Sequence, residues 1–192
     1  MDLRLKGKTA VITGGSKGIG YAVAEGLAQE GVDLFILARN VEDLNEAARK
    51  LEEKYDVNCM GIKSDVTRLE DLKNAETIIK ENTETVDILI NNAGYGSFGA
   101  VEEVPLEEVK RQFEVNLFGL SELTKLIIPG MRENNYGKII TEYNHYYIDS
   151  CYHKIKVSKK YQKWNHIRRI NYRDKSIISK IISFLKRWIY EI

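Results

Sequence analysis

A glycine-rich segment near the N-terminus has the residue types and the spacing of a phosphate-binding loop. It follows a short apolar run and precedes a helical pattern, and it reads Thr13-Gly14-Gly15-Ser16-Lys17-Gly18-Ile19-Gly20. Glycine lets a backbone turn tightly and approach a ligand closely. The helix that follows presents unpaired N–H groups and a partial positive charge at its N-terminus. The segment therefore predicts a pyrophosphate site, with a glycine-rich turn that binds nothing as the alternative.

Two basic residues indicate which dinucleotide such a site would take. A carboxylate at the end of the second strand, about 20 residues further on, would bind the ribose 2′-hydroxyl of NAD. This chain has Ala38-Arg39 at that place, and Asp33 lies at the other end of the strand. Arg39 and Lys17 could both reach a 2′-phosphate, because guanidinium and ammonium groups bind phosphate well. Each could instead be a solvated surface charge, but together they favour NADP(H).

Polar residues after later apolar runs are further candidates. Asn91-Asn92-Ala93-Gly94 follows the fourth run, and the carboxyl ends of parallel strands are where such sheets bind ligands. A plain Asn/Gly turn is the alternative there, and Asp65 is by default a cap or turn residue. Asn116 falls on the apolar stripe of a long helix, where an unbonded amide would cost about 1–3 kcal/mol. It either bonds nearby backbone or is a site residue that holds a water.

Short apolar runs alternate with helical patterns over the first 140 residues. Predicted strands centre on residues 9–12, 34–37, 60–62, 88–90 and 138–140, and predicted helices span 18–29, 41–54, 67–80 and 105–132. Asn40 is predicted to cap the second helix, and Thr67 with Glu70 has capping-box spacing. Continuous apolar strands separated by helices indicate a parallel sheet covered on both faces, which is a doubly wound α/β fold.

Composition places the chain among ordinary globular proteins. It has 192 residues, of which 43% are hydrophobic and 30% charged. No apolar run reaches 18 residues and the N-terminus lacks a signal-peptide pattern, so we expect neither a membrane span nor secretion. The two cysteines have no metal-ligand spacing, which favours a reduced, cytoplasmic protein without a metal site. No recognised nucleic-acid motif is present.

Together, these motifs resemble the short-chain dehydrogenase/reductase family. The resemblance rests on TGGSKGIG, on NNAG and on Asn116, 24 residues after Asn92, and it covers residues 6–140. It implies a Rossmann-type α/β/α sandwich that binds NADP(H). It also implies an oxidoreductase that transfers a hydride to or from a carbonyl or alcohol substrate, in a protein that forms homo-oligomers.

The resemblance also implies roles for individual residues. The pyrophosphate and its ribose would be held by Gly14, Ser16, Gly18, Ile19 and Gly20. Arg39 would bind the 2′-phosphate, Asp65 and Val66 would flank the adenine, and the central part of the cofactor would be lined by Asn92, Ala93 and Gly94. Asn116 would belong to a catalytic tetrad with a Ser, a Tyr and a Lys. In that tetrad the Asn positions a water, the Ser orients the substrate, the Tyr is the acid/base, and the Lys lowers the pKa of the Tyr.

The family pattern stops near residue 140. The family's Ser is expected at position 143 or 144, where this chain has Tyr143 and Asn144. The family's Tyr is expected near position 156, which is Lys156 here. Tyr152 and Lys156 have the Y-x-x-x-K spacing and are the candidate acid/base pair. They come about four residues early, and about one such match is expected by chance in this segment.

The composition changes sharply at the same place. Residues 1–140 have a net charge of −7 and residues 141–192 of +8, and the latter contain no Gly, Ala, Pro or Met. Ile, Lys, Asn and Tyr, which have A/T-rich codons, are frequent there, so a shift of reading frame after Ile140 is our hypothesis. The chain then divides into a Rossmann NADP-binding domain, 1–140, and an atypical basic tail, 141–192. Such a sheet would be truncated after about five strands, with the fifth as an exposed apolar edge.

Three classes of function remain open on the sequence. The first is an NADP(H)-dependent oxidoreductase. The second is a catalytically deficient nucleotide-binding remnant, which keeps the phosphate-binding loop and lacks the acid/base. The third is a non-functional or membrane-associated product, because apolar and basic residues from Asp174 to Ile192 have helical spacing.

Overall fold

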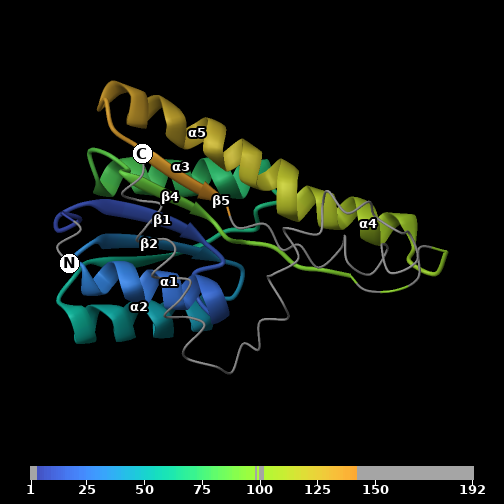
Figure 1. Ribbon diagram of the computed structural model, residues 1–192, viewed down its shortest axis with the longest axis horizontal. Helices are drawn as coiled ribbons and strands as arrows, with labels where there is room; N and C mark the ends of the chain where they lie inside the picture. The colour runs from blue at the N-terminus through green and yellow to red at the C-terminus, as the bar shows by residue number, and fades with distance from the viewer. Residues whose placement is uncertain (1–3, 98, 100–101, 142–192) are drawn as a thin grey trace, which may run out of the picture.

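The computed structural model describes residues 4–97, 99 and 102–141, which contain one parallel β-sheet (Figure 1). Its strands are Thr9–Thr13 (β1), Asp33–Ala38 (β2), Cys59–Lys63 (β3), Ile88–Asn91 (β4) and Lys138–Thr141 (β5). They lie in the order β3-β2-β1-β4-β5, and all four pairings are parallel. This arrangement confirms the predicted doubly wound sheet. Every residue of the central strand β1 is buried, which is why its sequence does not alternate between apolar and polar residues.

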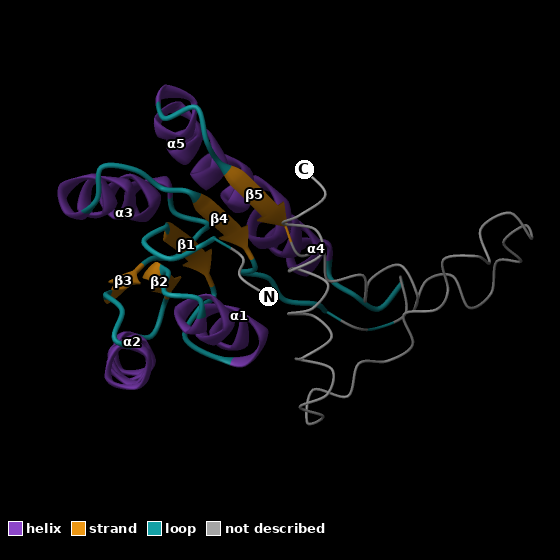
Figure 2. Ribbon diagram, turned by 60° about the vertical axis from the view of Figure 1, so that its left-hand side comes forward, coloured by secondary structure: helices purple, strands orange, loops and turns teal. Residues whose placement is uncertain are grey.

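Helices cover both faces of the sheet (Figure 2). One face packs against Gly18–Gln29 (α1) and Val41–Tyr55 (α2), and the other against Leu69–Asn82 (α3) and Leu120–Glu133 (α5). Two apolar clusters result, one around Ile36 beneath α1 and α2 and one around Leu89 beneath α3 and α5. Each fully buried side chain of this size stabilises the fold by about 1.5–3 kcal/mol relative to exposure. The sandwich therefore depends on both helical layers.

Two predicted helix starts had different outcomes. Asn40 caps α2, because its Oδ1 accepts the backbone N–H of Asp43 at 3.1 Å. The capping box predicted at Thr67 is wrong: α3 begins at Leu69, after an N-cap residue with no side-chain cap. The hydroxyl and backbone N–H of Thr67 instead donate to Asp65 Oδ1, at 2.8 and 3.0 Å. The carboxylate of Asp65 accepts both hydrogen bonds, so it holds Thr67 in the turn before α3.

The long helix predicted over 105–132 contains an irregular turn. It consists of Leu106–Phe113 (α4), a π-helical turn at Glu114–Gly119 (η1) and α5. A π turn bonds residue i to residue i+5, and such turns are often found at functional sites. This one contains Asn116, which the sequence singled out as an amide within an apolar stripe. In Figure 1, α4 extends beyond the sheet, past the carboxyl ends of the strands.

The strand β5 is the edge of the described sheet, as predicted. It pairs with β4 only, and the Ile139 side chain on it is 41% exposed. Among the described residues, no helix is both long enough and apolar enough to span a bilayer.

The thiol of Cys59, in the edge strand β3, is expected to be unreactive. Cys59 is buried, and burial, helped by the negative charge of Glu52, raises its pKa to about 12. At pH 8 the thiolate is therefore about a thousandfold scarcer than for a thiol at its ordinary pKa, and the thiolate is the reactive form. A Cys151→Ser chain keeps Cys59 as its one cysteine. We expect a chromogenic disulfide reagent to modify it at least about a hundredfold more slowly in the folded protein than in denaturant. Equal rates would contradict this packing of β3.

Candidate functional site

The glycine-rich loop joins β1 to α1 at the carboxyl end of the sheet. Gly14 and Gly18 have φ of +67° and +58°, which side chains other than glycine rarely adopt. The backbone N–H of Gly14 donates to the carbonyl of Leu37 at 2.7 Å, which ties the loop to the end of β2. The α1 helix begins at Gly18 with no acidic residue in its first turn, so its positive end is not neutralised by its own residues.

The sheet ends of β1 and β4 are held together by the hydroxyl of Thr13. This oxygen accepts the backbone N–H groups of Asn92 and Ala93 at 3.0 and 2.9 Å. In return, the Asn92 side-chain amide donates to the carbonyls of Thr13 and Gly14, at 2.9 and 3.3 Å. Thr13 is fully buried. The sequence analysis did not assign it a role, although a hydroxyl at the end of a buried strand signals a polar group that needs partners.

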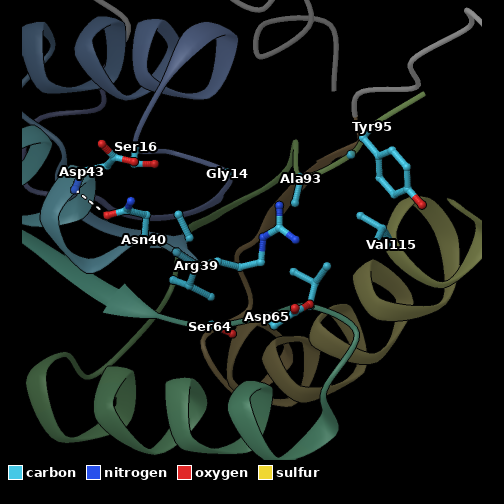
Figure 3. A pocket seen from close by; sticks show the side chains of 14 residues that line it. Gly14, Ser16, Arg39, Asn40, Asp43, Ser64, Asp65, Ala93, Tyr95 and Val115 are labelled. Carbon is cyan, nitrogen blue, oxygen red and sulfur yellow. Dashed lines mark hydrogen bonds between the residues drawn. The ribbon is translucent and has the colours of Figure 1, made fainter. Parts of the chain in front are cut away.

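A cavity of about 340 Å³ opens beside the hydrogen bonds that join the ends of β1 and β4 (Figure 3). Its volume lies within the range of small-molecule sites. Its lining residues come from the ends of four strands and from η1. They are Gly14, Ser16, Leu37, Ala38, Arg39, Asn40, Asp43, Ser64, Asp65, Val66, Ala93, Gly94, Tyr95 and Val115. The carboxyl ends of parallel strands thus form the cavity, where a doubly wound sheet binds its ligands.

The structure brings together about half of the residues predicted for the site. Those that line the cavity are Gly14, Ser16, Arg39, Asp65, Val66, Ala93 and Gly94. The predicted residues outside the lining are Lys17, Gly18, Ile19, Gly20, Asn92 and Asn116. Tyr152 and Lys156 lie outside the described residues. The lining residues that the sequence analysis did not assign to the site include Asn40, Asp43, Ser64, Tyr95 and Val115.

Charged groups lie on two sides of the cavity. The Arg39 side chain reaches across its middle (Figure 3). Burial opposes ionisation of Asp65, but hydrogen bonds from Thr67, together with the charges of Arg39 and Arg111, outweigh it and hold the pKa of Asp65 below its ordinary value. Asp65 is therefore an anion at neutral pH. An anion at this place can accept a hydrogen bond from an amino group, such as that of a purine.

Ser64 supplies a polar group without a partner in the described structure. Its side chain is 2% exposed, it lines the cavity, and its Oγ makes no hydrogen bond. A buried hydroxyl without a partner costs about 1–3 kcal/mol. Ser64 lies next to Asp65, so both side chains can form hydrogen bonds with a ligand that has donors and acceptors. The lining thus suits the adenosine part of a dinucleotide.

The Lys17 side chain, which the sequence suggested as a second contact to a 2′-phosphate, already has an anionic partner in the structure. Its Nζ forms an ion pair with Asp43 Oδ2 at 2.7 Å, and the Lys17 side chain is 70% exposed. Asp43 lines the cavity and Lys17 does not. Arg39 is therefore the only basic residue that lines the cavity in the described part of the chain.

Asn116 bonds the backbone on the far side of the cavity. Its Oδ1 accepts the N–H of Tyr95 at 3.0 Å, and its Nδ2 donates to the Tyr95 carbonyl at 2.8 Å. The amide therefore bonds backbone, but its partner lies 21 residues away and is not the local backbone of the first alternative. The contact fixes the segment that follows β4, which includes the lining residues Ala93 and Gly94.

The same π turn packs closely against the segment after β3, where Val66 lines the cavity. A Cβ atom on Gly119 would lie 2.2 Å from the carbonyl oxygen of Val66, so only glycine fits. Val115, in the same turn, lines the cavity. The η1 turn therefore positions two walls of the site, one through Val66 and the other through Tyr95.

Comparison with known proteins decides the family. The model of the short chain dehydrogenase family matches residues 8–142. This chain belongs to the short chain dehydrogenase family. The family predicted from the glycine-rich segment, NNAG and Asn116 is thereby confirmed.

Relatives within the short chain dehydrogenase family use both nicotinamide cofactors. The Helicobacter pylori protein VdlC, by name a short-chain type dehydrogenase/reductase, is 38% identical over 133 residues, which are 68% of this chain and 45% of that protein. L-sorbose reductase from Gluconobacter frateurii, solved with NADPH and L-sorbose, has a TM-score of 0.71 and 39% identity, over 73% of this chain and 54% of that one. A 7α-hydroxysteroid dehydrogenase solved with NADH has a TM-score of 0.69 and 30% identity, over the same shares. The chain spans about half the length of the curated relatives it matches.

The described part of this chain contains no candidate metal site. Residues 4–97, 99 and 102–141 contain no group of three or more His, Cys, Asp or Glu side chains that could hold a metal ion.

Proposed function

We propose that residues 1–140 are a nucleotide-binding domain that prefers NADP(H), in an oxidoreductase acting on a carbonyl or alcohol. One observation carries the proposal: the cavity at the strand ends is entered by Arg39 and has no carboxylate at the end of β2. An acidic residue at that place would favour the 2′-hydroxyl of NAD, whereas an arginine can bind a 2′-phosphate through two N–H groups. The NADPH bound to L-sorbose reductase supports the same preference.

The proposal assigns contacts to the residues around the cavity. The pyrophosphate and its ribose lie against the loop and the start of α1, at Gly14, Ser16, Gly18, Ile19 and Gly20. Arg39, with Lys17 beside the cavity, binds the 2′-phosphate. Asp65 and Val66 flank the adenine, and the centre of the cofactor lies along Asn92, Ala93 and Gly94. When bound, a nicotinamide supplies or accepts the hydride.

We assign proton transfer to Tyr152 and Lys156, which lie outside the described residues. Tyr152 exchanges a proton with the substrate oxygen, and Lys156 stabilises the phenolate. Asn116 holds the segment after β4 against η1, which its two hydrogen bonds to Tyr95 support. The substrate is a small molecule with a carbonyl or hydroxyl group.

We also propose that the coding sequence shifts frame after residue 140. The family model matches up to residue 142, and the composition changes at the same place. Determination of the nucleotide sequence tests this. A Ser, a Tyr and a Lys at family spacing in another frame would support the shift, and their absence from every frame would exclude it.

Titration with NADPH and NADH, followed by nicotinamide fluorescence, tests the cofactor proposal. We expect NADPH to bind at least about tenfold more tightly than NADH. Arg39→Met should weaken NADPH binding about tenfold and leave NADH binding within about twofold, because only NADPH has the phosphate that Arg39 contacts.

Arg49→Met is the matched control. Arg49 lies on the exposed side of α2, where it pairs with Glu53, and it does not line the cavity. It should leave both affinities unchanged. Equal affinities of the unmodified chain for the two nucleotides would contradict the NADP(H) preference. Tight NADPH binding without turnover of any carbonyl in a broad panel would identify the chain as a nucleotide-binding protein that lacks the acid/base.

A further inference from the structure

At one end of the cavity, a positive and a negative side chain form an ion pair, so their charges cancel and the pair does not attract a phosphate. Asp43 lies in the first turn of α2 and lines the cavity. Its carboxylate takes Lys17 as its ion-pair partner, with Nζ and Oδ2 2.7 Å apart. This pair has no net charge, so Arg39 alone contributes positive charge to that end of the cavity lining.

Two local interactions favour Asp43 in the first turn of α2. Its backbone N–H donates to Asn40 Oδ1 at 3.1 Å, as drawn in Figure 3, and this bond caps α2. A carboxylate in the first turn also interacts favourably with the positive end of the helix. Both effects favour a carboxylate at this place. The helix start therefore fixes a negative charge at the cavity wall.

A fixed anion there affects the two cofactors differently. A phosphate monoester has a charge between −1.5 and −2 at neutral pH, roughly, whereas the 2′-hydroxyl of NAD(H) is neutral. A 2′-phosphate beside Arg39 must compete with Asp43 for Lys17, and where it draws Lys17 away it meets the uncompensated negative charge of Asp43. The hydroxyl meets neither cost, since a carboxylate can accept its hydrogen bond.

We propose that Asp43 is a cofactor-specificity residue that weakens the preference of this chain for NADP(H). It does so by holding Lys17 in an ion pair and by placing a negative charge beside the 2′-phosphate position. The inference rests on the proposed nucleotide-binding function. The unmodified chain then discriminates less strongly against NAD(H) than Arg39 and Lys17 alone would.

Replacement of Asp43 by asparagine tests the proposal. Asp43→Asn removes the charge, keeps the size of the side chain and leaves the backbone bond to Asn40 in place. We expect its Kd for NADPH, measured by nicotinamide fluorescence, to fall about fivefold, and its Kd for NADH to change by less than about twofold. Added salt should reduce the difference between the variant and the unmodified chain, because counterions screen partly exposed charges.

Glu42→Gln is the matched control. Glu42 is the other acidic residue in the first turn of α2, it is exposed, and it does not line the cavity. It should change neither Kd by more than about twofold, although it removes the same charge from the same helix turn. Thermal unfolding followed by circular dichroism shows whether each variant folds. If Asp43→Asn does not fold, Asp43→Ser takes its place, since serine is favourable near a helix start.

Each outcome distinguishes this inference from the proposed function. A gain in NADPH affinity for Asp43→Asn alone would support the inference. Equal gains for Asp43→Asn and Glu42→Gln would show a general charge effect, and a loss for Asp43→Asn would show that Asp43 prepares Lys17 for the phosphate; either result overturns it. If the unmodified chain binds neither nucleotide, the proposed function itself fails, and the inference fails with it.

Discussion

A Gly20→Ala chain is expected to lose nucleotide binding and to be less stable by about 1–3 kcal/mol or more. A Cβ atom on Gly20 would lie 2.2 Å from the carbonyl oxygen of Gly14 and 2.5 Å from Nδ2 of Asn92. The first neighbour is backbone, and the second is held by two hydrogen bonds. Neither can move without opening the loop. We expect NADPH affinity to fall at least about a hundredfold, because the N–H groups of the loop would no longer converge on the pyrophosphate.

Urea unfolding and NADPH titration measure the two parts of this prediction. Gly130→Ala is the control, because a Cβ atom on Gly130, inside α5, would meet nothing within 4 Å. It should leave NADPH binding unchanged and be neutral or up to about 1 kcal/mol stabilising, since alanine favours helix more than glycine does. Gly20→Ala with the stability and affinity of the unmodified chain would show that the start of α1 does not pack against the loop as described.

Thr13→Val is expected to destabilise the fold by about 2–4 kcal/mol and to weaken NADPH binding. Valine has nearly the same shape as threonine, so the core packing is kept and only the hydroxyl is lost. The partly buried backbone N–H groups of Asn92 and Ala93 would both lose their acceptor. Each unsatisfied buried group costs about 1–3 kcal/mol. Ala93 and Gly94 line the cavity, so their displacement would also disturb the central part of the nucleotide site.

Thr13→Ser restores the hydroxyl and isolates its contribution. We expect it to recover most of the stability and affinity that Thr13→Val loses, with a small deficit from the missing methyl group. Chemical denaturation and NADPH titration of the two variants side by side give the comparison. If Thr13→Val matches the unmodified chain and Thr13→Ser is the less stable variant, the methyl group and not the hydroxyl is what matters at this position.

The local elements of this fold were predictable because near neighbours in the sequence determine them. The run Ile88-Leu89-Ile90 is apolar without alternation, which indicated a strand covered on both faces, and it lies in the buried strand β4, Ile88–Asn91. Asn40 was recognisable as a cap because its side chain reaches a backbone N–H three residues away. The wrong prediction at Thr67 also concerns near neighbours in the sequence. The carboxylates of Asp65 and Glu70 both lay within reach of Thr67, and the capping-box pattern considered only that of Glu70.

The candidate site was predictable only as far as its glycines and its family motifs. The spacing from Gly14 to Gly20 indicated a loop between β1 and α1, and the structure has one there. The spacing did not show that Lys17 pairs with Asp43, because Lys17 directly precedes α1 and Asp43 lies in α2, and the two meet only when these helices pack side by side.

From the sequence alone, the family, the order of strands and helices and the glycine-rich loop could be determined, since each depends on residue types and short spacings. Tertiary structure decided which side chains share the cavity. The Thr13 hydroxyl meets the backbone of Asn92 and Ala93 across 79 and 80 positions of the chain, and Asn116 meets Tyr95 across 21. Contacts at such separations follow from how strands pair and how a π turn places its residues, and no local pattern records either.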